Sequence, residues 1–479
     1  ILDAAKGAGV VIPTLCHFPG VASPGSCRVC LVEVEGARTL QPSCVTEVRE
    51  GMNVRTTSKT AREARRLSVE LMLANHPWDC NACVRNGQCE LQTLAQEMGI
   101  TEVRFPYARE AMPVDESTPA LVRDMNKCIL CRRCVAVCQD VQSVGTLAPR
   151  ARGFDTVIGT GAGEELEEAV CVQCGQCSAV CPVGAIYEKD ATEPVWAALD
   201  DPTKHVVVQT APAIRAALGE CFGCEPGTRV TGKMVTALRR LGFDKVFDTN
   251  FTADLTIIEE GHELLTRLKR ALVEKDESVR LPMFTSCSPG WINYMEYFYP
   301  NLIPNISSCK SPQQMFGALA KTYYAEKEGL DPKDVVVVSV MPCTAKKFEC
   351  VRDEMNDSGF QDVDCVLTTR ELGQLIKEAG IDFLSLPDGE QDSPMGMSTG
   401  AADIFANTGG VMEAALRTVH EVVTGRPLPM DKLHVVPVQG LDGLKEASVT
   451  FTDCLEDWNF LEGVTAKVAV AHGLANAHK

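Results

Sequence analysis

The sequence predicts a multidomain protein in which small α+β domains that hold metal clusters precede a larger α/β domain. Fifteen of its 23 cysteines fall in tight runs before residue 182, and such runs are typical of metal ligands. From about residue 204, apolar strand-like runs alternate with amphipathic helical ones, which indicates a largely parallel sheet. At 479 residues the chain is long enough for three or four domains.

The composition excludes several classes of protein. A net charge of −18 argues against nucleic acid or an anionic membrane as partner, and favours another protein or a small neutral substrate. No run of 18 apolar residues is present, and the first residues lack the regions of a signal peptide. We therefore expect a soluble, cytoplasmic protein whose thiols stay reduced and serve as metal ligands. Because the chain begins without Met, we also expect residues upstream of it.

The first group of thiols lies in a predicted domain at 1–55. Its members are Cys16, Cys27, Cys30 and Cys44. Three of them share a loop rich in Gly and Pro, and the fourth follows a predicted hairpin at 31–40. This pattern resembles a plant-type [2Fe–2S] ferredoxin of β-grasp fold with an altered loop length. A structural zinc site uses the same number of ligands, but zinc spacings are usually two short pairs.

The second group, in a predicted domain at 56–112, adds a histidine to three cysteines. Its members are His76, Cys80, Cys83 and Cys89. One imidazole and three thiolates can hold a [4Fe–4S] cluster, and the neutral ligand changes the cluster's charge and hence its potential. A histidine alone is more often a hydrogen-bonded core residue, but this one precedes three spaced cysteines.

The third group, in a predicted domain at 113–198, resembles a two-cluster ferredoxin. It has two runs with C-x2-C-x2-C-x3-C spacing, in which the fourth cysteine of each run crosses to the other cluster. One [4Fe–4S] cluster is therefore predicted on Cys128, Cys131, Cys134 and Cys181. The other is predicted on Cys171, Cys174, Cys177 and Cys138. One [2Fe–2S] and three [4Fe–4S] clusters in a row form a wire for electrons, and their order along the chain points to the segment 199–479.

That last segment is the predicted α/β domain. We expect strands at 205–211, 245–250, 281–286 and 335–340, and helices at 212–220, 255–272 and 370–380. Ligands of such folds sit beyond the carboxyl ends of the strands. The stretches TSCSP and MPC stand at two of these ends, so Cys287 and Cys343 are expected to face each other across one pocket. The alternative is a pair of buried core thiols.

On these motifs the whole chain resembles the catalytic subunit of an iron-only, or [FeFe], hydrogenase of the long form with accessory clusters. TSCSPGW (285–291) and MPCTAKKFE (341–349) match two signature motifs of that family, and the order of the domains matches too. The resemblance implies reversible interconversion of H2 with protons and electrons at an H-cluster, a [4Fe–4S] cubane bridged through a Cys to a di-iron unit. The N-terminal segments alone also resemble the large iron–sulfur subunit of respiratory complex I.

The resemblance implies roles for single residues near the H-cluster. Cys343 matches a ligand of the cubane, Lys346 a residue that hydrogen-bonds an iron-bound cyanide, and Met341 a side chain packed on the di-iron unit. The family's first motif has two adjacent cysteines, a proton carrier and then a cubane ligand, but here the second is Ser288. Either Cys287 becomes the ligand or Ser288 stands in the ligand's place, and we favour Cys287 because a thiolate suits iron better than a hydroxyl.

The resemblance also implies a proton relay. Glu260 and Glu263, three residues apart and so on one helix face, match it together with Ser307 and Arg267. Two carboxylates on a helix are more often a solvated face when judged alone. Glu349 resembles a structural partner of the second motif loop.

Some features of the chain set limits on this interpretation. The family's third motif supplies two further cubane cysteines and lies beyond a segment that resembles VAVAHGLANAHK (468–479), and Cys454 stands in the wrong context for it. The catalytic domain is therefore expected to be incomplete and the H-cluster to need the full-length protein. No nicotinamide or flavin fingerprint is present, so we expect ferredoxin or NAD(P)H-linked flavin and iron–sulfur subunits as partners. A pure electron-transfer subunit of a respiratory or formate-oxidising complex, or an H2 sensor, is the alternative. Packing or surface roles are expected for Cys221, Cys224, Cys309, Cys350, Cys365 and Cys454.

Overall fold

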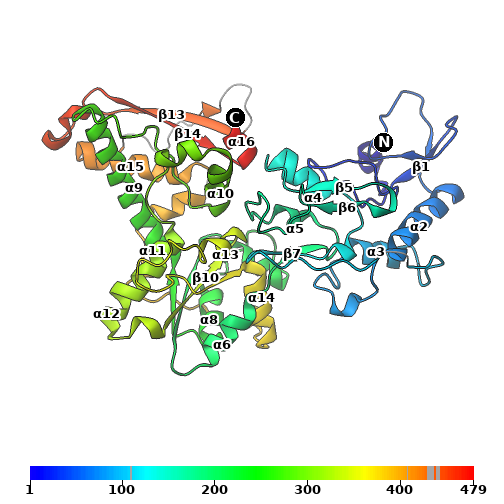
Figure 1. The fold of residues 1–479 in the computed structure, drawn as a ribbon, viewed down its shortest axis with the longest axis horizontal. Helices are drawn as coiled ribbons and strands as arrows, with labels where there is room; N and C mark the ends of the chain where they lie inside the picture. The colour runs from blue at the N-terminus through cyan, green and yellow to red at the C-terminus, as the bar shows by residue number, and fades with distance from the viewer. Residues whose placement is uncertain (108–109, 407, 429–435, 438–442) are drawn as a thin grey trace. The chain divides into compact units, whose positions relative to one another are not determined.

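The computed structural model describes residues 1–107, 110–406, 408–428, 436–437 and 443–479 (Figure 1). The chain forms two compact units, Ile1–Lys189 and Asp190–Lys479. None of the helices within the described ranges is long and apolar enough to cross a membrane.

The first unit begins with a small α+β arrangement. Its elements are α1 (Leu2–Gly7), β1 (Leu31–Val34), β2 (Gln41–Pro42), β3 (Val54–Arg55) and α2 (Lys59–Ala74). The strands form an antiparallel sheet in the order β2–β1–β3, which confirms a hairpin at the predicted place. Helix α2 starts where the Ser58 side chain accepts a hydrogen bond from the Ala61 N–H, and it packs on β1.

The rest of the first unit consists of short elements around the cysteine runs. They are α3 (Glu90–Glu97), β4 (Leu121–Arg123), α4 (Arg133–Ala136), β5 (Ala148–Arg150), β6 (Val157–Gly159), α5 (Gln176–Val180) and β7 (Ile186–Glu188). Strand β4 pairs with β7, and β5 with β6. One hydrophobic core includes residues beside all three cysteine groups, among them Leu15, Leu91 and Cys134. The loops of the three groups are therefore parts of one packed body.

The second unit is built on a parallel sheet in the order β11–β10–β8–β9. Its strands are β8 (His205–Thr210), β9 (Lys245–Asp248), β10 (Val335–Met341) and β11 (Cys365–Thr368). The valine-rich strands β8 and β10 are buried almost throughout, as strands of a sheet covered on both faces are. The predictions of strands near 205–211, 245–250 and 335–340 are confirmed.

The helices that surround this sheet largely match the predicted alternation. They are α6 (Thr192–Asp200), α7 (Ile214–Ala217), α8 (Thr231–Leu241), α9 (Thr249–Leu272), α10 (Pro289–Phe298), α11 (Pro312–Leu319), α12 (Ala325–Glu328), α13 (Ala345–Glu349) and α14 (Thr369–Glu378). Helix α14 begins with a capping box in which Thr368 and Glu371 satisfy each other's backbone N–H groups.

The strand predicted at 281–286 is wrong. Only an isolated bridge joins Phe284 to Ile306, and the stretch from Leu281 to Ser288 is mostly exposed. An apolar run becomes a strand only where a neighbouring strand can pair with it. Among the described residues no strand pairs with this run beyond the single bridge. The loop nevertheless ends at Ser288, which directly precedes α10 with Pro289 as the first helical residue.

A further layer lies beyond the parallel sheet. It consists of α15 (Gly410–Thr424), β12 (Val436–Pro437), β13 (Leu444–Thr450), β14 (Thr465–Ala471) and α16 (Leu474–His478). Helix α9 runs from the end of β9 and packs along α15, and a core of Leu265, Val419 and Phe451 joins them to this layer (Figure 1). Helix α9 therefore spans both layers of the unit.

Candidate active site and cluster sites

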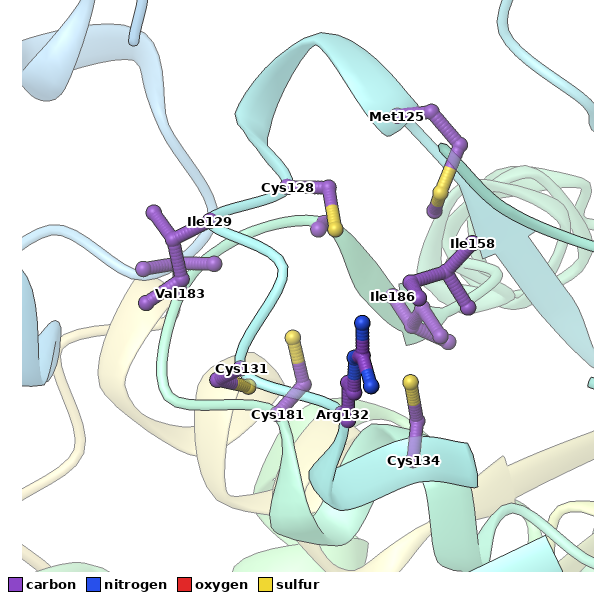
Figure 2. Close-up of a pocket in the computed structure, with 11 residues that line it drawn as sticks. Met125, Cys128, Ile129, Cys131, Arg132, Cys134, Ile158, Cys181, Val183 and Ile186 are labelled. Carbon is purple, nitrogen blue, oxygen red and sulfur yellow. The ribbon is translucent and has the colours of Figure 1, made fainter. Parts of the chain in front are cut away.

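Four thiols from two distant runs line one cavity in the first unit. They are Cys128, Cys131, Cys134 and Cys181, and Figure 2 shows their sulfur atoms directed into a common space. Apolar side chains such as Met125, Ile158 and Ile186 complete the wall. Burial raises the pKa of Cys131 to about 12, so this thiol is neutral at pH 7 without a bound cation, and iron binding would be needed to ionise it.

A second cavity repeats this arrangement with the other predicted set of four thiols. Its thiols are Cys138, Cys171, Cys174 and Cys177, and its apolar wall includes Leu121, Val137 and Leu166. Burial again raises the pKa of Cys171 to about 12. Each cavity thus receives three thiols from one run and the fourth from the other, which is the juxtaposition that the spacing predicted. The chemistry of the lining, thiols within an apolar wall, fits an iron–sulfur cluster.

Matching backbone turns create the two cavities. Leu130 and Gln173, at equivalent positions of the two runs, adopt positive φ angles of 56° and 54°. Their N–H groups donate to the sulfur atoms of Cys128 and Cys171, each at 3.4 Å. Short helices follow in both runs, α4 after Arg132 and α5 after Gly175, and both of these residues are left-handed as well.

The four N-terminal thiols also lie close together. The Cys16 N–H donates to Cys27 Sγ at 3.3 Å, and the sulfur atoms of Cys30 and Cys44 are 3.4 Å apart. A hydrogen bond from the Cys27 side chain lowers the pKa of Cys16 to about 5, while burial raises the pKa of Cys44 to about 12. Arg65, which is buried and donates to the Leu31 carbonyl at 2.7 Å, lies near Cys30.

The predicted one-histidine site has an unpartnered imidazole nitrogen. His76 is buried, its Nδ1 has no hydrogen-bond partner among the described residues, and burial lowers its pKa, so the ring is neutral. Burial raises the pKa of Cys89, and Cys83 and Cys80 are near enough to raise it further. A buried imidazole nitrogen without a partner costs free energy unless something binds it. The donor set therefore fits a metal centre.

The backbone of Gly184 approaches the Cys83 thiol of this site closely, and a side chain at this position would collide with it. A Cβ atom at Gly184 would come within 2.7 Å of Cys83 Sγ. We expect Gly184→Ala to displace that thiol and lower the iron content of the protein, whereas Gly161→Ala, which meets nothing within 4 Å, should not. Iron and sulfide analysis of the two purified variants checks this, and equal iron contents would contradict it.

Two buried cations beside these sites were missed by the sequence analysis. Lys127 lies 3.3 Å from Asp79 and 3.4 Å from Asp124. Arg133 binds both carboxylate oxygens of Glu90 at 2.6 and 2.7 Å and donates to the His17 carbonyl at 3.2 Å. The only signal in the sequence is their position next to predicted ligands, because Lys127 precedes Cys128 and Arg133 precedes Cys134.

In the second unit the two signature motifs meet at one end of the sheet. Cys343 lies in the short turn between the end of β10 at Met341 and the start of α13 at Ala345. Helix α10, which follows Ser288, packs against α13, and Cys287 is near enough to raise the pKa of Cys343, although burial is the larger cause. Cys287 is exposed, so the alternative of two buried core thiols is wrong for it.

The residues around Cys343 form a buried polar group. Lys346 Nζ lies 2.9 Å from both oxygens of Glu349. Glu349 also accepts from Ser311 Oγ at 2.9 Å and from Gln313 Nε2 at 3.0 Å, while Gln313 Oε1 is buried without a partner. Met341 belongs to the hydrophobic core beside the same strand end. A buried ammonium group and a thiol in one place fit an anionic metal cofactor.

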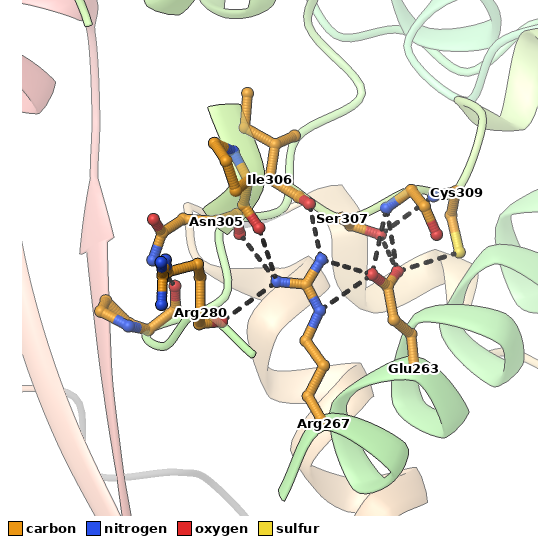
Figure 3. Close-up of polar contacts among 10 residues, drawn as sticks. Glu263, Arg267, Arg280, Asn305, Ile306, Ser307 and Cys309 are labelled. Atoms are coloured by element: carbon orange, nitrogen blue, oxygen red, sulfur yellow. Dashed lines mark hydrogen bonds and ion pairs between the residues drawn. The ribbon is translucent and has the colours of Figure 1, made fainter. Parts of the chain in front are cut away.

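Two of the predicted relay residues, Ser307 and Arg267, converge on a third, Glu263 of α9 (Figure 3). Ser307 Oγ donates to Glu263 Oε2 at 2.6 Å, and Arg267 Nη2 donates to Oε1 at 2.6 Å. Arg267 also donates to four backbone carbonyls, which hold it in place. Cys309, for which only a packing or surface role was expected, lies with its sulfur atom 3.7 Å from Glu263 Oε2.

The two relay carboxylates differ in ionisation. Burial and the charge of Glu263 raise the pKa of Glu260 to about 7. Burial opposes ionisation of Glu263 too, but the hydrogen bonds from Ser307, Ser308 and Arg267 outweigh it and lower its pKa. Paired groups with pKa values pushed apart are typical of proton transfer. Glu260 can exchange a proton near neutral pH while Glu263 stays charged.

Comparisons with known proteins agree with this geometry. The iron-only hydrogenase large subunit, C-terminal domain, matches residues 204–479. The chain belongs to the iron-only hydrogenase family. Its iron–sulfur segments match a 2Fe-2S cluster-binding domain at 1–59, the iron–sulfur binding region of NADH-ubiquinone oxidoreductase G at 65–104, and a 4Fe-4S dicluster domain at 127–185. It is thus a hydrogenase subunit with accessory iron–sulfur domains.

Individual relatives support the same conclusion. This hydrogenase is 51% identical over its whole length to an NADP-reducing hydrogenase subunit of Solidesulfovibrio fructosivorans, and 40% identical to iron hydrogenase 1 of Clostridium pasteurianum; it spans 80% of each. It also resembles a solved [FeFe]-hydrogenase from Chlamydomonas reinhardtii with a TM-score of 0.54 and 47% identity, over 60% of this chain and 77% of that one. The pure electron-transfer alternative has no better support.

Proposed function

We propose that this hydrogenase interconverts H2 with protons and electrons at an H-cluster held beside Cys343, with Cys287 as the favoured second protein ligand. The observation that supports this most is the meeting of the two signature motifs, because it brings Cys287 near the thiol that follows β10. When bound, the di-iron unit supplies the open metal site at which H–H bonds are broken and formed.

The chain's own residues supply the surroundings of that chemistry. Lys346 provides a buried positive charge beside Cys343, and Glu349 orients it. Met341 contributes an apolar wall that keeps water away. Protons pass between the site and solvent by way of Glu260, while Ser307 and Arg267 hold Glu263 ionised and the charge of Glu263 favours the protonated form of Glu260.

Electrons travel through one [2Fe–2S] and three [4Fe–4S] clusters in the first unit. The proposed ligand sets are the four groups predicted from the sequence, in domains at 1–55, 56–112 and 113–198. The two mixed cavities and the unpartnered His76 nitrogen support these assignments. Ferredoxin or NAD(P)H-linked flavin subunits are the proposed partners, since a related hydrogenase is named for NADP reduction. A cytoplasmic location remains a prediction.

Infrared spectroscopy of the matured full-length protein tests the proposed function. We expect bands from iron-bound carbonyl and cyanide, and H2-dependent dye reduction by the same sample, because both depend on the complete H-cluster. Electron paramagnetic resonance (EPR) of the accessory clusters is the control for iron–sulfur loading. Intact accessory clusters without the infrared bands would instead favour the pure electron-transfer subunit.

A further inference from the structure

The ammonium group of Lys127 is buried beside the one-histidine site. The residue is 9% exposed, and its Nζ lies 3.3 Å from Asp79 Oδ2 and 3.4 Å from Asp124 Oδ2. A Cβ atom at Gly184 would be 2.7 Å from Cys83 Sγ and 3.5 Å from Lys127 Cδ, so the lysine side chain runs next to that thiol. The Lys127 side chain thus lies beside the predicted ligand Cys83.

Such a cation affects a cluster through its charge. Reducing an iron–sulfur cluster adds one negative charge, which a nearby positive charge stabilises, so the reduction potential rises. The effect is larger where protein excludes water, as it does around a side chain this buried. A neutral imidazole in place of a thiolate acts in the same direction because it removes one negative charge from the ligand set.

Lys127 lies next to residues of two predicted cluster sites. Its backbone leads into Cys128, a predicted ligand of the next cluster, while its side chain runs next to Cys83. Other cations lie beside the cavity of Cys128: Arg132, which lines it and is exposed, and Arg133, which is buried and binds both carboxylate oxygens of Glu90. Each site thus has a buried cation beside it, Lys127 next to Cys83 and Arg133 next to the cavity of Cys128.

We propose that the charge of Lys127 raises the reduction potential of the cluster on His76, Cys80, Cys83 and Cys89. This rests on the proposed function, because it requires a cluster at His76. The charge of the lysine stabilises the reduced form of the one-histidine cluster, and ion pairs with Asp79 and Asp124 keep the lysine in place.

Redox titration of the reconstituted full chain, followed by EPR, tests the proposal. Lys127→Met should lower the midpoint potential of the one-histidine cluster by at least 59 mV, a tenfold change in the one-electron equilibrium constant. The signal is assigned by its loss in Cys83→Ser. Lys127→Arg, which keeps the charge, should restore the potential, and Lys59→Met, at an exposed lysine of the same unit, should leave it unchanged.

The possible results separate the proposal from its premise. An unchanged midpoint in Lys127→Met with full spin intensity overturns the proposal while leaving the cluster assignment intact. The absence of any signal that Cys83→Ser removes overturns both. If the Met variant loses iron, Lys127→Gln, which can still hydrogen-bond to Asp124, is measured in its place against the same threshold.

Discussion

Glu260→Gln is expected to lower H2 turnover by about 10²–10⁴-fold, the usual contribution of a positioned proton-transfer group. The amide cannot carry the proton that Glu260, with its pKa raised to about 7, exchanges near neutral pH. The pH dependence of the residual activity should also lose the ionisation near pH 7. Turnover by gas chromatography across pH 5–9 measures both effects.

The matched control is Glu259→Gln on the same helix, at an exposed position, and it should retain full activity.

The stability of the Glu260→Gln variant provides a second check, because the direction of the change can be predicted. Burial raises the pKa of Glu260 in the folded protein. The folded state therefore loses stability relative to the unfolded state as the pH rises above the pKa that this carboxyl has in the unfolded chain. Glu260→Gln should therefore not lower the free energy of unfolding at pH 8, and an inactive variant that is also unstable would contradict the relay role.

Cys181→Ser is expected to remove one whole [4Fe–4S] cluster, about four iron atoms per chain, and the cluster lost should be the one beside Cys128. The cavities support this crossing because Cys181 lines the space framed by the first run, not by its own. Iron analysis together with Mössbauer spectroscopy measures the loss.

Double variants identify which cluster is lost. Adding Cys128→Ser to Cys181→Ser should cost no further iron, because both thiols line the same cavity. Adding Cys174→Ser should remove a second cluster, because Cys174 lines the other cavity. The opposite pattern would show that each run serves its own cluster. Cys454→Ser, at a thiol of the other unit, should leave the iron content unchanged.

The sequence was most informative where the chemistry depends on local spacing. The runs around Cys128 and Cys171 place three thiols on one short turn each, so their grouping could be predicted, including the crossing of Cys181. The strand at 281–286 could not be excluded, because the apolar run LPMF does not show whether another strand lies beside it.

Contacts between distant segments could not be predicted from the residues. Nothing in the sequence says that Ser307 hydrogen-bonds Glu263, or that Cys309 lies beside it, and only the family resemblance pointed to Ser307. Lys127 was also missed, since a lysine beside a ligand is usually solvated and its burial depends on Asp79, Asp124 and the bare Cα of Gly184.

The interleaving of the two cysteine runs has a consequence for how the protein withstands air. Oxidation of one shared thiol, Cys138 or Cys181, disturbs a loop that also frames the neighbouring cavity. Air damage at Cys181 should consequently appear first as loss of the cluster beside Cys128, the cluster that the other run frames.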